Sequence, residues 1–360
     1  MNSCKTLLNA LRTGAHDKSL AALYALDGTQ DSLDKARDRA CRVVQSLIDT
    51  FCPEDSAPAA LFSGPGRTEI GGNHTDHQHG HVLCGSVDMD MLACAVPNGL
   101  ACIRIQSEGY PALEIALDDL SVREEEKNTS AALVRGVAAR VKELGYPLSG
   151  FDACVVSTVL SGSGLSSSAA YETLVGNIFN HFCCADKLDP VTIAKIGQYA
   201  ENTYFGKPCG LMDQMGSSVG GAVFIDFNDP ANPIVERVDY DFSQSGFALC
   251  IVDTASSHGD LTDDYADITR EMGAVAAHFG KAVLRDVPPA DFQAALPALR
   301  TECGDRAVLR AMHFYDDDRL AAQEANALKR DSFETFLNMV IASGLSSSLC
   351  LQNTWSIHDP

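Results

Sequence analysis

The sequence predicts a two-domain protein of mixed α and β structure, an α+β fold. Its 360 residues are 46% hydrophobic, which suffices for a large core and favours more than one domain. Strand-like runs rich in β-branched residues alternate with runs whose apolar residues recur at helical spacing. The clearest transition lies mid-chain, where the strand-like run 151–159 (FDACVVSTV) passes through a glycine turn into the helix-like run 171–182 (YETLVGNIFNHF).

The chain begins with a helical stretch, residues 1–30, that carries no chemical motif and is expected to be an appendage. An amphipathic helix follows, because apolar residues from Leu33 to Leu47 fall along one helical face. The expected elements then come in this order: helix 31–51, strands 82–96 and 99–105, helix 128–144, strand 151–159, helices 171–182 and 189–205, strands 222–226 and 247–253, and alanine-rich helices from residue 267.

The charge balance limits the possible partners. Lys and Arg number 27 against 48 Asp and Glu, a formal charge of −21. This charge repels nucleic-acid backbones and anionic lipid, so neither nucleic acid nor a membrane is an expected partner. An acidic chain that binds a nucleotide must do so locally, through helix N-termini, single basic residues and a metal ion.

The cysteines indicate a reducing compartment. There are thirteen of them, scattered and without a C-x-x-C pair, which is typical of free thiols. The N-terminal apolar stretch is too short for a signal peptide, and no segment approaches the roughly 20 apolar residues of a membrane span. The sequence therefore predicts a cytoplasmic protein, and a monomer is expected.

The first chemical motif is the glycine-serine turn before the helix-like run 171–182. Its glycines permit a close backbone approach to a ligand, and a helix start offers unpaired N–H groups and partial positive charge to an anion. Serine hydroxyls and a nearby carboxylate suit Mg²⁺, for which Ser167 and Glu172 are the candidates. The alternative is a glycine turn with a serine cap and no ligand. The candidate phosphate loop comprises Gly162, Ser163, Gly164, Leu165, Ser166, Ser167 and Ser168.

The second motif is a polar, glycine-rich stretch at residues 62–80 (FSGPGRTEIGGNHTDHQHG). The guanidinium of Arg67 suits a phosphoryl group, whereas the clustered Asn, His and Asp side chains suit sugar hydroxyls. A rival interpretation is a metal site, although structural zinc prefers separated ligand pairs. That site would be built from His74, Asp76, His77, His79 and His81.

Both motifs resemble those of a known enzyme family. GPGRTEIGGNHTDHQHG is similar to the galactokinase signature, and GLSSSAA is similar to the ATP-phosphate motif of the wider GHMP kinase family. The similarity covers about residues 31–275 and includes a CG-x-MDQ pattern around Asp213. It implies a two-domain GHMP kinase fold with mixed or antiparallel sheets and an active site between an N-terminal domain, 31–210, and a C-terminal domain, 211–360.

The resemblance also implies a reaction and its residues. ATP and Mg²⁺ would bind the phosphate loop, and the γ-phosphoryl group would pass to the anomeric hydroxyl of galactose or a related sugar. Arg67 and Asp213 match the family's catalytic pair, and Asp213 either accepts the hydroxyl proton or only orients the hydroxyl. The residues implied in sugar binding are Asn73, His74, Asp76, Gly210 and Tyr265.

The sequence departs from the family at two of these places. Asn73 stands where galactokinases carry glutamate, and Ser257 stands at a usual arginine position. An amide both donates and accepts hydrogen bonds, which predicts a wider choice of hydroxyl or acetamido arrangements. Two alternatives stay open: a kinase for another sugar or amino-sugar, and a non-catalytic sugar sensor. Retention of Arg67 and Asp213 favours the enzyme.

The C-terminal third raises two further expectations. A second GLSSS at 344–348 lacks a preceding strand and a second glycine, so it is predicted to be a helix connection or a kinked helix. The family's third, glycine-rich motif is not found after residue 300, where Gly304 and Gly344 are the only glycines. We therefore expect a truncated C-terminal domain with an exposed strand edge or apolar patch near residues 162–168.

Overall fold

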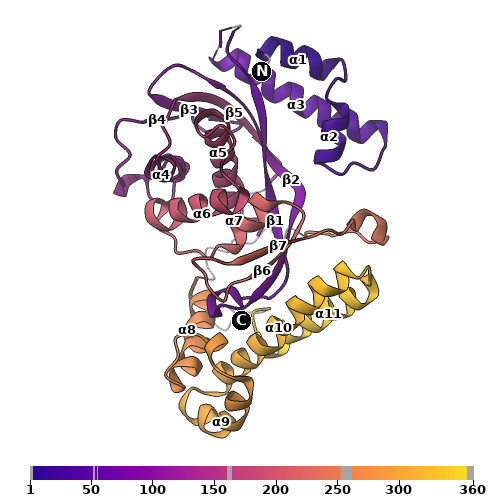
Figure 1. Cartoon of the computed structure of the whole chain (residues 1–360), viewed down its shortest axis with the longest axis vertical. Coiled ribbons are helices and arrows are strands. Elements are labelled where there is room, and N and C mark those ends of the chain that lie inside the picture. Colours follow the sequence, from indigo (N-terminus) through magenta and orange to yellow (C-terminus); the bar gives the residue numbers. More distant parts are fainter. Residues whose placement is uncertain (1–2, 52, 55, 160–163, 253–261, 355–360) are drawn as a thin grey trace. The chain divides into compact units, whose positions relative to one another are not determined.

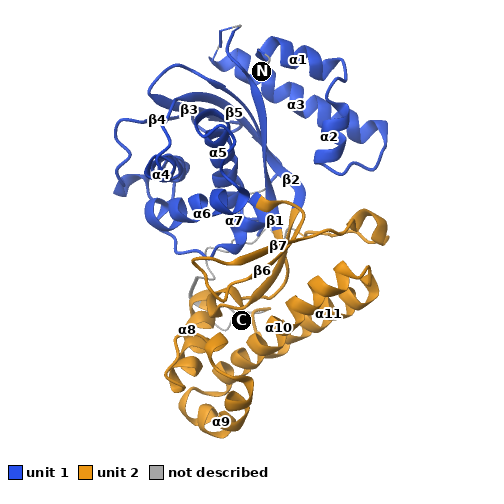
Figure 2. Ribbon diagram, viewed as in Figure 1, with its two compact units in different colours: residues 1–67, 87–218 blue, residues 68–86, 219–360 orange. Residues whose placement is uncertain are grey.

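A computed structural model describes residues 3–51, 53–54, 56–159, 164–252 and 262–354 (Figure 1). The chain forms two compact units, residues 1–67 with 87–218 and residues 68–86 with 219–360 (Figure 2). The units differ from the expected division at residue 210, because residues 68–86 cluster with the C-terminal part of the chain. This stretch joins β1 (Ala60–Gly71) to β2 (His81–Pro97), two long strands that each contribute residues to both units.

The strands form one seven-stranded sheet in the order β4-β3-β5-β2-β6-β7, with β1 paired to β2. The first half of β2 pairs with β6, and its second half pairs with β5. The pairs β2–β5, β2–β6, β3–β4 and β6–β7 are antiparallel, whereas β3 and β5 are parallel. The remaining strands are β3 (Cys102–Ser107), β4 (Leu113–Ala116), β5 (Phe151–Ser157), β6 (Ala222–Asp226) and β7 (Ile234–Val238).

The first unit has a helix layer on each face of its strands (Figure 1). Successive strand side chains point to opposite faces. Ala93 and Ala95 of β2 accordingly join the core shared with α4–α6, whereas Leu92 and Cys94 join the core shared with α1 and α3. The helices of this unit are α1 (Cys4–Arg12), α2 (Asp17–Leu23), α3 (Gln30–Phe51), α4 (Ser130–Glu143), α5 (Ser167–Cys183), α6 (Pro190–Ala200) and α7 (Met212–Val219), with short turns η2 (Glu124–Glu126) and η3 (Glu201–Phe205).

The N-terminal helices are part of this unit rather than an appendage. Leu7 and Leu11 of α1 are buried in one core with Val43 and Leu47 of α3. Beyond α2, the Tyr24 hydroxyl donates to Asp90 Oδ2 on β2 at 3.0 Å. The segment expected as an appendage therefore packs its apolar helical face into a core with α3, β2 and β5.

The second unit is mostly helical. Helix α10 is its centre, since its side chains join one core with α8 and α9 and another with α11 and the strands β6 and β7. The elements of this unit are η1 (Asp76–Gln78), η4 (Phe242–Ser245), α8 (Thr262–His278), η6 (Leu284–Asp286), α9 (Pro289–Glu302), α10 (Asp305–Lys329), α11 (Phe333–Ser346) and the π-helical turn η7 (Ser347–Leu351).

Two expectations for this unit had different outcomes. The second GLSSS was expected to be a helix connection or a kinked helix; it lies instead where α11 passes directly into the π-helical turn η7. The strand expected over 247–253 is not formed in its described residues 247–252, where Phe247, Leu249 and Val252 are exposed. Its apolar run satisfies a strand pattern, but no described strand pairs with it. Although no segment of membrane-spanning length was expected, Phe333–Leu351 is long and apolar enough to cross a membrane by length and composition alone. Only 22% of its apolar window is buried, with Phe336 and Leu351 in cores of this unit.

Candidate active site

The described part of the phosphate loop ends in a tight turn at the start of α5. Gly164 has φ 77°, and Ser166, the N-cap of α5, has φ 52°, a left-handed conformation unusual for a residue with a side chain. The Ser166 hydroxyl makes no capping bond, so this side chain does not occupy the N–H groups of the first helical turn. The expected positions Gly162 and Ser163 lie outside the described residues.

Strand β1 runs close beneath this turn. A Cβ atom added to Gly64 would lie 2.3 Å from the Ala170 carbonyl oxygen, so only glycine allows α5 to approach β1 this closely. Farther along the strand, the Arg67 N–H donates to the Leu165 carbonyl at 3.1 Å, and Arg67 Nη1 donates to the Gly164 carbonyl at 2.6 Å. The GPGR stretch and the GLSSS stretch are therefore one local structure within the first unit.

Arg67, Asp213 and Ser166 meet at this turn. Arg67 Nε donates to Asp213 Oδ1 at 2.8 Å, and Nη2 lies 2.6 Å from the same oxygen. The Ser166 hydroxyl donates to Asp213 Oδ2 at 2.5 Å. Asp213 is in the first turn of α7, directly after the loop that contains Gly210. The two residues expected to be catalytic are thus in direct contact beside a helix N-terminus.

Behind this pair lies a buried carboxylate cluster that the sequence analysis did not foresee. Gln214 Nε2 donates to Glu172 Oε2 at 3.0 Å and to Glu201 Oε2 at 2.8 Å. Burial raises the pKa of Glu172 well above its usual range, and the charge of Glu201 adds to this shift. In the MDQ pattern, therefore, the aspartate faces Arg67, whereas the glutamine separates two buried acids.

These contacts bear on which residues suit Mg²⁺. Ser167 and Glu172 were the expected ligands. Glu172 and Glu201 are equally buried, at 1% and 2% exposed, but the raised pKa of Glu172 favours its neutral form. The Ser168 hydroxyl instead lies 3.1 Å from Glu201 Oε1, which brings a hydroxyl and a carboxylate together at the first turn of α5. Oxygen donors of this kind fit a hard divalent cation. The geometry favours Ser168 and Glu201.

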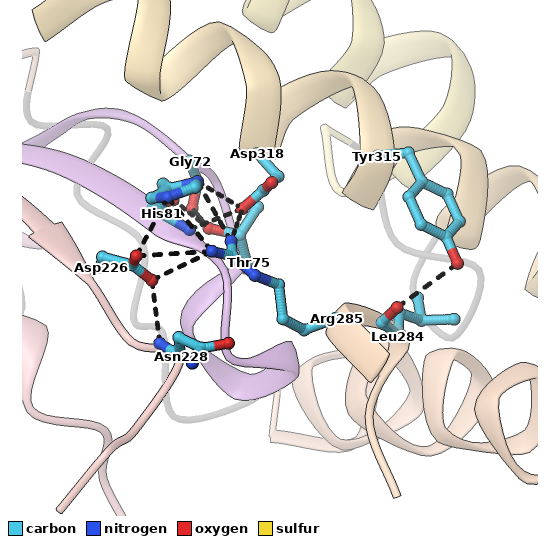
Figure 3. Close-up of polar contacts among 9 residues, drawn as sticks. All are labelled: Gly72, Thr75, His81, Asp226, Asn228, Leu284, Arg285, Tyr315 and Asp318. Carbon is cyan, nitrogen blue, oxygen red and sulfur yellow. Dashed lines mark hydrogen bonds and ion pairs between the residues drawn. The ribbon is translucent and has the colours of Figure 1, made fainter. Parts of the chain in front are cut away.

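The sugar-signature residues belong to the second unit, where the loop 72–80 is closed by Thr75 (Figure 3). The fully buried Thr75 hydroxyl lies 2.8 Å from the Gly72 carbonyl and 2.5 Å from the His81 carbonyl. Gly72 has φ 87°, and an added Cβ there would lie 2.3 Å from the His81 carbonyl oxygen. The glycines of this signature are therefore required for the turn itself.

A charged network supports the end of this loop (Figure 3). The His81 ring lies between Asp226 and Asp318, with nitrogen-oxygen distances of 3.4 and 3.0 Å. Arg285 reaches both carboxylates, at 3.3 and 3.1 Å. Among the described residues, no group of three or more His, Cys, Asp or Glu is placed to hold a metal ion. The described residues of this loop are therefore not arranged as the rival metal site would require, and Arg285 together with the His81 N–H binds the acids beside His81.

The other expected sugar ligands lie on the same loop or near it. His74 has φ 60°, and its ring centroid is 5.5 Å from that of Tyr265 on α8. Burial lowers the pKa of His74 to about 4, although Asp76 opposes this shift. His74 is therefore a neutral imidazole at physiological pH, with one donor and one acceptor nitrogen for a sugar hydroxyl. Asp76 and Asn73 are both partly exposed.

The structure thus forms two separate groups from the expected residues. Arg67 and Asp213 lie with the phosphate loop in the first unit, and the sugar-signature residues lie with Tyr265 in the second. Sequence reasoning missed Glu201 and Gln214, which sit in ordinary helical patterns. It also missed two side chains of α10 that bond the backbone of Asn73, His313 and Asp317.

Comparison with known proteins agrees with this geometry. The family model for the GHMP kinases N terminal domain matches residues 132–221, and the model for the galactokinase galactose-binding signature matches residues 50–97. A crystal structure of Lactococcus lactis galactokinase complexed with galactose superposes with a TM-score of 0.68 at 20% identity, covering 85% of this chain and 78% of that one. A Methanococcus jannaschii mevalonate kinase has a TM-score of 0.53 at 15% identity, covering 82% of this chain and 80% of that one. The fold and the two signatures define a small-molecule kinase of the GHMP class.

Sequence relatives narrow this class. Galactokinase of Homo sapiens is 31% identical over 296 residues, which cover 79% of this chain and 72% of that protein. Galactokinase of Streptomyces coelicolor is 33% identical over 258 residues, 70% of this chain and 65% of the relative. The chain belongs to the galactokinase family, although it spans only 65% to 75% of the length of the galactokinases compared.

Proposed function

We propose that this chain is a sugar kinase that transfers the γ-phosphoryl group of ATP to the anomeric hydroxyl of galactose. The observation that carries the proposal is the contact of Arg67 with Asp213 beside the N-terminus of α5. Membership of the galactokinase family supports the choice of sugar. The comparisons do not favour a kinase for another sugar or a non-catalytic sensor.

The roles in the first unit follow from charge and geometry. Phosphoryl transfer has a loose transition state, so a site must position the groups and compensate charge. The N–H groups at the start of α5 suit phosphate oxygens. Arg67 holds Asp213 through Oδ1, and Ser166 holds it through Oδ2. Oδ1 accepts from both Arg67 nitrogens, whereas Oδ2 accepts from Ser166 alone and has a second lone pair. Through Oδ2, Asp213 can therefore also accept a bond from a substrate hydroxyl and orient it.

The second unit supplies groups for sugar recognition. The neutral His74 ring, the Asp76 carboxylate and the Asn73 amide offer donors and acceptors that match sugar hydroxyls. Tyr265 adds a hydroxyl and an aromatic ring whose centroid is 5.5 Å from that of His74. These residues are our candidates for sugar binding, with Gly210 as a further candidate in the first unit.

Mg²⁺ fits the proposal at Ser168 and Glu201, whose oxygens are 3.1 Å apart. When bound, the ion would neutralise charge on the transferred phosphoryl group. Gln214 fixes the other Glu201 oxygen, which orients the carboxylate towards Ser168. The proposal includes a cytoplasmic location, in line with the galactokinase relatives, and activity as a monomer.

The test is sugar-dependent ADP release by the purified chain. Galactose, glucose, N-acetylgalactosamine and a sugar-free reaction should be compared, and phosphorus NMR should identify the phosphorylated carbon. We expect release with galactose and a phosphate on the anomeric carbon. Galactose binding without ADP release would instead favour a sensor, and a preference for another sugar would overturn the substrate assignment.

A further inference from the structure

Helix α10 holds both backbone polar groups of Asn73. The Asn73 N–H donates to Asp317 Oδ2 at 2.6 Å, and His313 Nε2 donates to the Asn73 carbonyl oxygen at 2.9 Å. His313 and Asp317 are four residues apart, so they project from the same face of α10. Both side chains are completely buried. The peptide groups on either side of the Asn73 Cα are therefore fixed by one rigid helix.

The second serine run holds the Asn73 side chain. Asn73 Nδ2 donates to Ser347 Oγ at 3.0 Å. The adjacent Ser346 hydroxyl lies 2.8 Å from His313 Nδ1, so the second ring nitrogen of His313 is also held by this serine run. Ser346 ends α11, and Ser347 begins the π-helical turn η7. The GLSSS at 344–348, although not a phosphate loop, thus supports the sugar-signature loop.

These contacts determine which atom of the Asn73 amide remains available. Ser347 occupies one hydrogen of Nδ2, whereas Oδ1 has no hydrogen-bond partner among the described residues. An amide whose nitrogen is held in this way presents its oxygen, which is an acceptor. The glutamate that galactokinases carry at this position also presents an acceptor. The asparagine was expected to let the site accept a wider range of sugars. The hydrogen bond to Ser347 opposes this, because it leaves the amide oxygen as the group presented to the sugar.

We propose that Ser347 is a specificity-determining positioning residue, and that His313 and Asp317 are positioning residues for the same loop. Ser347 fixes the Asn73 amide so that its oxygen accepts from a sugar hydroxyl, and α10 fixes the backbone that carries this amide. The proposal rests on the sugar-kinase function proposed above. It explains why a residue in the π-helical turn is buried and directed at a loop distant in sequence.

The kinetic test removes the Ser347 hydroxyl. Ser347→Ala should raise the KM for galactose about five-fold, the effect of losing one neutral hydrogen bond. The KM for ATP should not change, and the preference for galactose over N-acetylgalactosamine should fall about five-fold. Ser347→Thr keeps a hydroxyl and should restore most of both values. Ser348→Ala is the matched control, because Ser348 is exposed in the same turn and should leave all values unchanged.

A second measurement does not depend on activity. In ¹⁵N-labelled protein, the Asn73 side-chain NH₂ signal should exchange with solvent about five-fold faster in Ser347→Ala. The Asn73 backbone N–H should exchange about ten-fold faster in Asp317→Ala, because it loses a charged acceptor, whereas Asp317→Asn keeps an acceptor and should protect it. Both sets of signals are compared with the wild-type chain.

The two measurements distinguish the possible failures. If the wild-type chain phosphorylates no sugar but the exchange rates change as expected, the proposed function fails and the positioning of Asn73 stands. If the chain phosphorylates galactose and Ser347→Ala alters neither the sugar preference nor the side-chain exchange, the positioning role is overturned. Faster exchange with an unchanged sugar preference would overturn the specificity role.

Discussion

The Arg67 guanidinium holds Asp213 through a single carboxylate oxygen, with Nε and Nη2 at 2.8 and 2.6 Å from Oδ1. Because both nitrogens converge on Oδ1, the other oxygen, Oδ2, is left for the Ser166 hydroxyl at 2.5 Å. The side-chain conformation of Asp213 is therefore fixed by Arg67 on β1 and by Ser166, the N-cap residue of α5. This arrangement makes separate predictions for the side chains of Asp213 and Ser166.

Asp213→Asn should lower kcat about 100- to 10,000-fold with little change in galactose or ATP binding. Asparagine keeps the size of the side chain and an acceptor for Arg67 but loses the charge that orients or deprotonates the hydroxyl. The loss therefore belongs to the transition state. Steady-state kinetics and calorimetric sugar binding measure the two effects. Asp88→Asn, an exposed substitution in the same unit, should leave both unchanged; near wild-type turnover in Asp213→Asn would show that Asp213 is misassigned.

Ser166 allows the contribution of its hydroxyl to be separated from that of its backbone. Ser166→Ala and Ser166→Gly both remove the bond to Asp213 and should lower kcat about ten-fold. Only glycine suits φ 52°, so the glycine variant should be about 1 kcal/mol more stable than the alanine variant. Thermal unfolding and turnover together check this. Equal stability of the two variants, or an unchanged kcat in both, would contradict the prediction.

Because α5 approaches β1 closely at Gly64, substitution of this glycine should strongly lower the stability of the folded chain. Gly64→Ala should destabilise the first unit by about 1–3 kcal/mol or more, because the added Cβ would lie 2.3 Å from a backbone carbonyl that cannot move aside. Differential scanning calorimetry measures the shift. Gly344→Ala is the control: this glycine lies in helix α11 with nothing within 4 Å of an added Cβ, so the change should be neutral or stabilising.

Much of the first unit and of the catalytic pair was predictable from sequence. The strand, turn and helix around residue 160 follow from local patterns, and β2 and β5 alternate between two cores as their periodicity requires. The contact of Arg67 with Asp213 followed from two motifs that resemble one family. Secondary structure and turns of this kind can be predicted from short stretches of sequence, because turn formation and hydrophobic periodicity depend on residues that are close together in the chain.

The remaining features depend on partners that are distant in sequence. The run 247–252 has a strand pattern but forms no strand, since pairing requires a neighbour that the local sequence does not specify. His313 and Asp317 lie about 240 positions after the loop that they hold. Asp317 also falls in an acidic DDD run that is typical of an exposed helix face, although it is fully buried. Buried polar contacts of this kind become visible only in three dimensions.

Glu324 on α10 gives the fourth prediction, which concerns pH. Both of its carboxylate oxygens are buried without a hydrogen-bond partner among the described residues, and Gly71 lies directly against them. Burial, with a further contribution from Asp317, raises the pKa of Glu324 to about 8. The folded chain therefore keeps this proton at a pH where the unfolded chain has already released it.

The sign of the effect follows from proton linkage. Between the ordinary pKa of 4.5 and the folded value of about 8, the folded state binds more protons than the unfolded state, so a rising pH favours unfolding. The cost should approach about 1.4 kcal/mol per pH unit within this window. Glu324→Gln resembles the protonated acid but cannot ionise. It should match the wild-type chain near pH 5 and become progressively more stable than it towards pH 8.

Calorimetric unfolding of the two chains at several pH values between 5 and 8.5 measures this difference. Glu334→Gln, on the exposed first turn of α11, is the matched control and should shift stability by the same amount at each pH. A constant difference between Glu324→Gln and the wild-type chain would mean that Glu324 ionises normally in the folded state. A difference that grows as the pH falls would reverse the predicted sign. Either result would require Glu324 to have a partner that stabilises its charge.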